Sequence, residues 1–356
     1  MSVKRPLRVL VIDDSAYSRR MIVSLLERSP LIEVADVARD GEEALRKALT
    51  LKVDLITLDL EMPRMDGFTF LRMLMAQKPT PVLVVSGLGG REDVWKALEL
   101  GAVDFVTKPT RRAAPELANI EAELVRKVLA SRELRIDRVR ERLRHAPEPA
   151  SAPIGGAPRV VVVGASTGGP AALLQLFGAI PDAGSCAFLV AQHMPEGFTR
   201  SFAERIARTT PFTAREAENG DAPALGTILI APGGRHFALE ASGGRVVARV
   251  TQAEASDRFA PSIDRLFISA AKQYGPDLLA IVLTGMGDDG AAGALAVKRA
   301  GGNVIAESEE TAVIYGMPRQ AVRIGAVDAV LPLYAIPKAI QNGFARESAK
   351  RERTES

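Results

Sequence analysis

The chain has 356 residues, of which 47% are hydrophobic and 25% charged, and its 46 basic and 43 acidic residues leave a net charge of +3. This length allows two domains, the composition is that of a globular chain, and the balanced charge gives no reason to expect a nucleic-acid partner. No stretch approaches the roughly 20 apolar residues of a membrane span and the start is not that of a signal peptide, so direct membrane insertion is not expected.

The first third of the chain alternates short β-branched runs with helical patterns, which predicts a parallel sheet covered by helices. Five strands are expected, at residues 8–12, 33–37, 54–58, 81–85 and 102–106. From residue 115 to about 145 the pattern predicts one long charged helix, rich in arginine in its second half, to which we assign no function. The Pro-, Ala- and Gly-rich stretch 146–158 then predicts a linker.

Acidic side chains follow two strands of this first sheet. Asp13 and Asp14 come directly after the first strand, Asp59 follows the third, and Lys108 follows the fifth. Strand carboxyl ends line the crevice of an open parallel sheet, and the first and third strands are neighbours in a flavodoxin-like order, so these acids should converge. Clustered carboxylates need a cation, and open oxygen sites suit Mg²⁺. A carboxylate beside Mg²⁺ and a lysine can take up a phosphoryl group.

The same region carries an ordered set of short motifs, namely Asp13-Asp14, Asp59-x-x-Met62-Pro63-x-x-x-Gly67, Ser86-Gly87 and Lys108-Pro109. The set resembles the receiver domains of two-component response regulators over roughly residues 6–130. The resemblance implies that Asp59 is the phosphoacceptor and that a sensor histidine kinase is the phosphodonor. It implies a magnesium site made of Asp13, Asp14, Asp59 and the backbone carbonyl of Glu61. It also implies a phosphorylation-sensing set made of Ser86, Phe105 and Lys108.

The second part of the chain again reads as parallel strands, at residues 159–163, 187–191, 226–230, 278–283 and 303–306. A hairpin is expected over 235–249, turning at Ser-Gly-Gly. The single cysteine, Cys186, lies in an apolar run; it excludes an internal disulfide and fits a reducing cytoplasm. Residues 346–356 form a charged tail.

A candidate nucleophile follows the first strand of this second domain. Ser166 lies in Gly-Ala-Ser-Thr-Gly, which matches the G-x-S-x-G pattern of a strand-to-helix turn, although a Gly-Ser turn is commonly just a helix cap. A serine nucleophile needs a base and a carboxylate that orients the base. His193 extends directly from a strand's carboxyl end and is favoured as the base, and His236, near another strand end, remains the alternative.

The orienting acid is expected in Leu-Thr-Gly-Met-Gly-Asp-Asp-Gly, residues 283–290, where Asp288 and Asp289 compete. It should accept the Nδ1–H of the histidine, and the backbone near Met286 could hold an oxyanion. The same stretch matches G-x-G-x-x-G with Glu307 about twenty residues further on, as in a dinucleotide site. Two aspartates in that loop would repel a pyrophosphate, which argues against this alternative.

Several motifs of the second domain resemble those of the chemotaxis receptor methylesterase/deamidase family over about residues 159–343. They are Gly-Ala-Ser166-Thr-Gly-Gly-Pro, Gln-His193-Met-Pro, Ala-Pro-Gly-Gly-Arg-His236, Pro261-Ser-Ile-Asp264 and Leu-Thr-Gly-Met-Gly-x-Asp289-Gly. The resemblance implies Ser166 as nucleophile, His193 as base and Asp289 as orienting acid, with Thr167 and Met286 in oxyanion or substrate binding and no cofactor for the hydrolysis. Implied substrates are glutamate methyl esters and glutamines on the cytoplasmic helices of chemoreceptors.

The expected fold class is α/β, with a flavodoxin-like receiver domain (1–130), a helical extension and linker (131–158), a doubly wound, mainly parallel-sheet hydrolytic domain with a β-hairpin (159–345) and a charged tail (346–356). The expected function is that of a cytoplasmic, phosphorylation-activated serine hydrolase for adaptation in chemosensory signalling. An alternative from another class is a non-catalytic response-regulator scaffold that binds receptor helices, and the complete triad argues against it.

Overall fold

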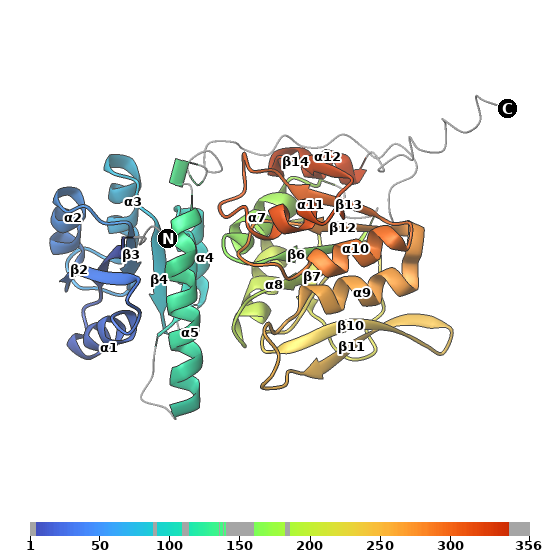
Figure 1. The fold of residues 1–356 in the computed structure, drawn as a ribbon, viewed down its shortest axis with the longest axis horizontal. Coiled ribbons are helices and arrows are strands. Elements are labelled where there is room, and N and C mark those ends of the chain that lie inside the picture. Colours follow the sequence, from blue (N-terminus) through green and yellow to red (C-terminus); the bar gives the residue numbers. More distant parts are fainter. Residues whose placement is uncertain are drawn as a thin grey trace. The chain divides into compact units, whose positions relative to one another are not determined.

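The computed structural model describes residues 5–87, 91–108, 114–134, 136–137, 139, 160–181 and 186–341. The chain divides into two compact units, Met1–His145 and Ala146–Ser356 (Figure 1). Among the described residues, no helix is both long and apolar enough to cross a membrane. The predicted linker and charged tail lie outside the described residues, so the domain limits proposed from the sequence stay predictions there.

The first unit is a five-stranded parallel sheet in the order β2-β1-β3-β4-β5. Its elements are β1 (Leu7–Ile12), α1 (Ala16–Leu26), β2 (Ile32–Ala38), α2 (Gly41–Thr50), β3 (Leu55–Leu58), α3 (Gly67–Gln77), β4 (Val82–Ser86), α4 (Arg91–Glu99), β5 (Asp104–Thr107) and α5 (Ala114–Ala130). The five expected strands and the flavodoxin-like order are confirmed. Alternate residues of β1 pack with α1 and α5, so these two helices share one face of the sheet.

The second unit contains a seven-stranded parallel sheet, β14-β13-β12-β6-β7-β9-β8, and a separate antiparallel hairpin, β10-β11. Its strands are β6 (Val160–Ala165), β7 (Ala187–Gln192), β8 (Thr213–Glu216), β9 (Thr227–Ile230), β10 (Arg235–Ser242), β11 (Arg245–Gln252), β12 (Leu278–Val282), β13 (Asn303–Glu307) and β14 (Ala329–Leu331). Its helices are α7 (Gly169–Gly178), α8 (Phe198–Thr209), α9 (Ile263–Tyr274), α10 (Ala291–Arg299), α11 (Met317–Arg323) and α12 (Ile336–Gln341). The strand order reverses between β6 and β12, where a ligand crevice is expected in such sheets.

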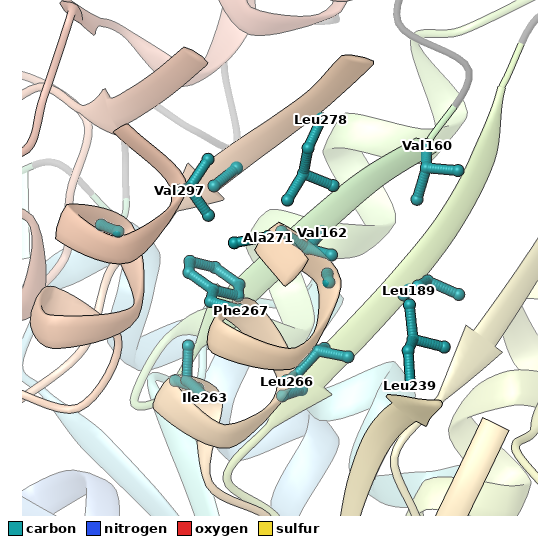
Figure 2. Packing of buried hydrophobic residues seen from close by; sticks show 14 of the residues in the cluster. Val160, Val162, Leu189, Leu239, Ile263, Leu266, Phe267, Ala271, Leu278 and Val297 are labelled. Atoms are coloured by element: carbon teal, nitrogen blue, oxygen red, sulfur yellow. The ribbon is translucent and has the colours of Figure 1, made fainter. Parts of the chain in front are cut away.

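Helix α9 packs into the hydrophobic core of the second unit. Apolar side chains recur along it at helical spacing, and Ile263, Leu266 and Phe267 are fully buried against β6, β7 and β12 (Figure 2). The hairpin adds Leu239 to the same cluster. A Cβ on Gly164, near the end of β6, would lie 2.3 Å from Ile263 Cγ2, so the missing side chain lets the start of α9 approach the strand. This contact brings the N-terminus of α9 to the carboxyl edge of the sheet.

The structure corrects the helix predicted over residues 115–145. Helix α5 ends at Ala130, a 3₁₀ turn covers Ser131–Glu133, and Leu134 is extended. The Ser131 hydroxyl donates to the Val128 carbonyl at 2.7 Å, a local contact of the kind that competes with helix propagation. Most of the arginine-rich half lies outside the described residues. Strands β8 and β14, at the two edges of the large sheet, were not predicted.

We expect Phe267→Ala to destabilise the second unit by about 3–5 kcal/mol, because it leaves a cavity in a close-packed core. The chain has one tryptophan, Trp95, in α4 of the first unit, so its fluorescence follows that unit alone. Urea unfolding by circular dichroism should show one transition at lower urea, while the Trp95 transition stays in place. Leu225→Ala, at a 58% exposed site, is the control and should change stability by less than about 0.5 kcal/mol. Equal losses in the two variants would contradict the assigned core.

Candidate functional site

The first unit has an acidic cluster at the carboxyl ends of β1 and β3. Asp13, Asp14 and Asp59 each offer an oxygen, and these oxygens lie within 4.8 Å of one another. Lys108, which follows β5, places Nζ 2.5 Å from Asp59 Oδ2 and 3.1 Å from Asp13 Oδ2. The structure thus brings together all four charged side chains that the sequence placed at strand ends.

Burial and crowding of like charges act on the two inner carboxyls. The pKa of Asp59 is raised to about 6, and burial is the main cause. The hydrogen bond and the charge of Lys108 act against this rise, and the Asp13 charge adds to it. Burial also raises the pKa of Asp13, against the pull of Lys108. For Lys108, burial acts to lower the pKa, but its contacts with Asp59 and Asp13 outweigh that effect and raise it. The single positive charge of Lys108 does not neutralise the three aspartates of the cluster.

The donor set fits a hard divalent cation. Asp13 Oδ2 is buried and, apart from its ion pair with Lys108, makes no hydrogen bond. The Glu61 N–H donates to Asp59 Oδ1 at 3.4 Å, so the Glu61 peptide lies beside the cluster. An under-satisfied carboxylate oxygen among three acids is the kind of group that Mg²⁺ coordinates in proteins.

The three residues expected to sense phosphorylation lie on β4, on β5 and just after β5. Ser86 ends β4 opposite Thr107, and its carbonyl accepts the N–H of Lys108 at 2.7 Å, so Ser86 and Lys108 are neighbours. Phe105 is buried and packs edge-on against Trp95, with ring centroids 5.6 Å apart. The first two therefore lie at the acidic edge, and Phe105 belongs to the interior beneath it.

In the second unit, Ser166, His193 and Asp289 meet at the carboxyl ends of β6, β7 and β12. Ser166 Oγ lies 3.1 Å from His193 Nδ1, and His193 Nε2 lies 2.8 Å from Asp289 Oδ2. The side chains of His193 and Asp289 are 7% and 3% exposed. These contacts join residues that are far apart in the chain into one hydrogen-bonded line.

The orientation of the imidazole differs from the sequence-based expectation. We expected the carboxylate to accept Nδ1–H, whereas Asp289 faces Nε2 and Ser166 faces Nδ1. The carboxylate can only accept, so Nε2 carries the proton and Nδ1 presents its lone pair to the serine hydroxyl. Compared with our expectation, Nδ1 and Nε2 are interchanged. The imidazole still lies between the serine hydroxyl and the carboxylate.

Asp289 is held by four donors. Besides His193 it accepts from the N–H groups of Ile263 at 2.8 Å and Asp264 at 3.0 Å, and from the Ser262 hydroxyl at 3.2 Å. Burial acts to raise the pKa of this carboxyl, but the hydrogen bond and charge of His193 and the two N–H groups outweigh burial, and the pKa is lowered. Asp289 is therefore ionised at neutral pH.

The neighbouring Asp288 has a different environment. Its side chain is 57% exposed and pairs with Arg258 at 2.8 Å. The Arg258 guanidinium lies 4.9 Å from the centre of the Phe259 ring, and Phe259 stacks on His193 with centroids 4.7 Å apart and planes 5° apart. Asp288 thus faces outward, and the Phe259 ring fixes the plane of the imidazole from the side.

His236, the alternative base, is buried and makes contacts of its own. Its Nε2 donates to Asp257 at 2.7 Å and its Nδ1 accepts the N–H of Ser262 at 3.3 Å. Both partners lie in the segment between β11 and α9, so His236 anchors that segment to the hairpin. It contacts neither Ser166 nor Asp289 in any hydrogen bond of the described residues.

The dinucleotide alternative is not supported by this geometry. Glu307 is fully buried and accepts the N–H of Thr284 at 2.7 Å. The N–H groups of Gly290 and Gly293, at the start of α10, donate to Asp264. The carboxylate that would bind a ribose and the amides that would bind a pyrophosphate are both engaged within the protein.

Two residues that shape the nucleophile turn were not predicted. The Thr284 carbonyl accepts the Ser166 N–H at 3.0 Å, and its hydroxyl donates to the Thr167 carbonyl at 3.0 Å. The Gln192 amide donates to the Ser166 carbonyl at 2.9 Å and the His193 carbonyl at 3.1 Å. Their positions in the motifs Leu-Thr-Gly-Met-Gly and Gln-His-Met-Pro were the only available signal.

The two residues expected to bind the oxyanion or substrate lie next to this turn. Thr167 follows Ser166, and its hydroxyl is buried with no hydrogen-bond partner. Met286 is half-buried and follows Gly285, where a Cβ would lie 2.7 Å from Ser166 Cβ. The missing side chain at Gly285 therefore brings the backbone before Met286 close to the serine.

Comparisons with known proteins agree with the two-unit organisation. Residues 161–340 match the family model described as CheB methylesterase, and residues 9–118 match the model of the response regulator receiver domain. Protein-glutamate methylesterase/protein-glutamine glutaminase 3 of Geobacter sulfurreducens is 46% identical, covering 94% of this chain and 97% of the relative. Protein-glutamate methylesterase/protein-glutamine glutaminase 6 of Anaeromyxobacter dehalogenans is 50% identical, covering 97% of this chain and 97% of the relative.

Among solved structures, the CheB methylesterase catalytic domain of Thermotoga maritima is 40% identical, with a TM-score of 0.49, and covers 52% of this chain and 98% of that chain. The methylesterase model matches half of the chain, and the relatives are matched along nearly their whole length. The chain therefore belongs to the CheB methylesterase family, in the form that carries a receiver domain ahead of the methylesterase domain.

Proposed function

We propose that this protein is a phosphorylation-activated serine hydrolase that removes methyl groups from glutamate methyl esters and deamidates glutamines on the cytoplasmic helices of chemoreceptors. The observation that carries the proposal is the line from Ser166 through His193 to Asp289, with hydrogen-bonding distances of 3.1 and 2.8 Å. The names of the relatives support the substrate class. We place the enzyme in the cytoplasm, where its substrate helices would lie.

The proposed reaction follows from the protonation states of the three residues. His193 Nδ1 takes the proton of Ser166 as the oxygen attacks the side-chain carbonyl carbon of the substrate. Asp289 accepts the Nε2–H and stabilises the imidazolium that forms. The tetrahedral intermediate then expels methanol, or ammonia from a glutamine, and the leaving group receives the proton from His193. Thr167 and the backbone near Met286 are our candidates for stabilising the oxyanion.

The second half of the reaction regenerates the serine. Water gives a proton to His193 Nδ1 as it attacks the acyl-serine carbonyl carbon, and the bond to Ser166 Oγ breaks. His193 returns the proton to Ser166, and the product glutamic acid side chain loses its remaining proton to solvent and leaves as a carboxylate. Besides the chain and the substrate, this sequence of steps uses one water molecule.

We propose that the receiver controls this hydrolysis through Asp59. Asp13, Asp14, Asp59 and the Glu61 carbonyl would hold Mg²⁺, which would supply charge neutralisation for the phosphoryl group. Lys108 already contacts the acceptor carboxylate, and Ser86 lies beside Lys108, so both can bind phosphoryl oxygens. Phe105, packed on Trp95 behind this edge, is the residue whose repacking would pass the change onward. A sensor histidine kinase is the proposed phosphodonor.

We expect His193→Ala to reduce kcat for methanol release from methylated receptor by about 10⁴-fold or more, the loss typical for removal of a triad member. His236→Ala should have a smaller effect on kcat, because His236 supports the segment before α9 and does not contact the serine. Ser166→Ala provides the inactive reference. A larger loss in the His236 variant would contradict the assigned base, and full signalling output from Ser166→Ala would favour the non-catalytic scaffold.

The two adjacent aspartates should differ sharply. Asp289→Asn is expected to lower kcat by about 10⁴-fold, because an amide no longer fixes the Nε2–H tautomer. Asp288→Asn removes only an exposed ion pair with Arg258, which is worth less than about 1 kcal/mol, and should leave kcat within a few-fold of the wild type. Thermal melting checks that both variants are folded. Comparable losses of kcat would show that the pair acts jointly.

Phosphorylation should depend on one carboxylate. With Mg²⁺ and a small acyl phosphate, the full chain should gain one labile phosphoryl group, because Asp59 is the proposed acceptor. Methanol release should then be faster, because phosphorylation is proposed to activate the hydrolysis. Asp59→Asn should gain none and keep its basal rate. Asp36→Asn, which changes a carboxylate on β2 paired with Lys47, is the control and should be labelled normally. Labelling of the Asp59 variant at the wild-type level would refute the assignment.

A further inference from the structure

Asp264, in the first turn of α9, caps a helix other than its own. Its Oδ1 accepts the N–H of Gly290 at 2.9 Å and the N–H of Gly293 at 2.6 Å. Gly290 is the N-cap of α10 and Gly293 lies in its first turn. Asp264 thus satisfies two of the N–H groups that the start of α10 leaves unpaired.

The same relation runs in the opposite direction. Asp289, which precedes α10, accepts the N–H groups of Ile263 and Asp264, the first two residues of α9. Each helix start is therefore held by a carboxylate that belongs to the other helix or its leading loop. The two carboxylates lock the loop of residues 285–290 to α9.

Helix capping alone does not account for an acid at residue 264. The pKa of Asp264 is raised to about 6, and burial is the main cause. The charges of Asp289 and Asp288 add to the rise, and the N–H groups of Gly293 and Gly290 act against it. A neutral side chain would avoid this cost, and α9 itself is capped by one, because the Ser262 hydroxyl accepts the Arg265 N–H. A carboxylate nevertheless stands at this position, with its oxygen directed at the loop that carries Asp289.

The loop is anchored at Gly285, through backbone hydrogen bonds with Ile314, Gly316 and Met317, and at the Asp289 carboxylate, but the residues around Asp289 add little to this. Gly287 and Gly290 both have left-handed backbones, with φ of 97° and 92°, and contribute no side chain. Asp288 is exposed and held only by the exposed Arg258 among the ion pairs of the described residues. The side chain of Asp264 therefore provides a half-buried, charge-assisted attachment for the peptide next to Asp289.

We propose that Asp264 is a positioning residue, which fixes Asp289 through the Gly290 peptide and, through Asp289, the ring of His193. This inference rests on the proposed function of the Ser166–His193–Asp289 site. A displacement of about 1 Å in a catalytic group can cost about 100-fold in rate, so loss of the anchor should act on kcat. In this proposal Asp264 acts through Asp289 rather than on the substrate, so KM should change little.

The test uses Asp264→Asn and Asp264→Ala in the full chain, with methanol release from methylated receptor as the assay. We expect kcat to fall by about 10-fold for Asn, a weaker acceptor than a carboxylate, and by about 100-fold for Ala, which accepts neither N–H group. KM should stay within about two-fold. Asp328→Asn is the matched control, because Asp328 also accepts a backbone N–H, that of Val304 at 2.8 Å, in the same unit. Its kcat should be unchanged.

Melting temperature separates positioning from mere stability. A carboxyl whose pKa is raised on folding binds its proton more tightly when folded, so its ionisation at pH 7.5 opposes folding. Asp264→Asn should therefore melt no lower than the wild type at pH 7.5 while losing kcat. A variant with wild-type kcat and a lowered melting temperature would overturn the proposal and leave Asp264 as a structural cap.

A double variant tests the route through Asp289. In an Asp289→Asn background, Asp264→Asn should cause no further loss of kcat, because the residue through which it acts has been removed. A further 10-fold loss would overturn the proposed route. Ser166→Ala, measured in the same assay, must be inactive. Activity in Ser166→Ala would refute the proposed function itself, whereas an inactive Ser166→Ala beside a fully active Asp264→Asn would refute only this inference.

Discussion

The Asp289 carboxylate lies buried where the end of β12 meets the start of α9, and it joins the imidazole of His193 to that helix. Its two oxygens receive the imidazole, a hydroxyl and two backbone N–H groups. Burying a charge is costly unless several donors replace its water, and the N-terminus of a helix provides such donors together with a favourable dipole. The close approach of α9 to β6, made possible by Gly164, is thus a condition for an ionised acid at this position.

The receiver and the second unit both carry a candidate site at strand ends, near the point where strand order reverses, but the pKa of the central carboxyl is shifted in opposite directions. In both, candidate site residues follow the two strands between which strand order reverses, β1 and β3 in the receiver and β6 and β12 in the second unit. Burial acts to raise the pKa in both places, yet the pKa of Asp59 is raised to about 6 and that of Asp289 is lowered. Asp59 is surrounded by acids and one lysine, so it is suited to a cation and a phosphoryl group. Asp289 is surrounded by donors, so it is suited to holding a proton on a neighbour.

Much of this arrangement could be predicted from the sequence, because the ends of strands can be located from their β-branched runs. Four of the site residues come directly after such strand ends, namely Asp13, Asp59, Ser166 and His193. The choice of Asp289 over Asp288 came from a motif, and its physical basis is visible only in the contact with α9. Thr284 and Asp264 lie in motifs of the sequence, but their contacts involve segments distant in the chain that meet only after folding, so the motifs do not reveal what these residues do. The imidazole orientation depends on the paths of two loops, and the 3₁₀ turn that ends α5 at Ser131–Glu133 interrupts a stretch whose residue pattern is helical throughout.

The lock between α9 and the loop before α10 also bears on how the protein is made. Ser166 and His193 leave the ribosome well before Thr284 and Asp289, and the N-terminal parts of a chain generally begin to fold first. Until the later segment is synthesised, the serine turn lacks its partner strand β12 and the imidazole lacks its carboxylate. A nascent chain that already carries the serine and the histidine therefore still lacks the carboxylate of the proposed triad. The proposed triad becomes complete only near the end of translation, after the receiver domain has emerged.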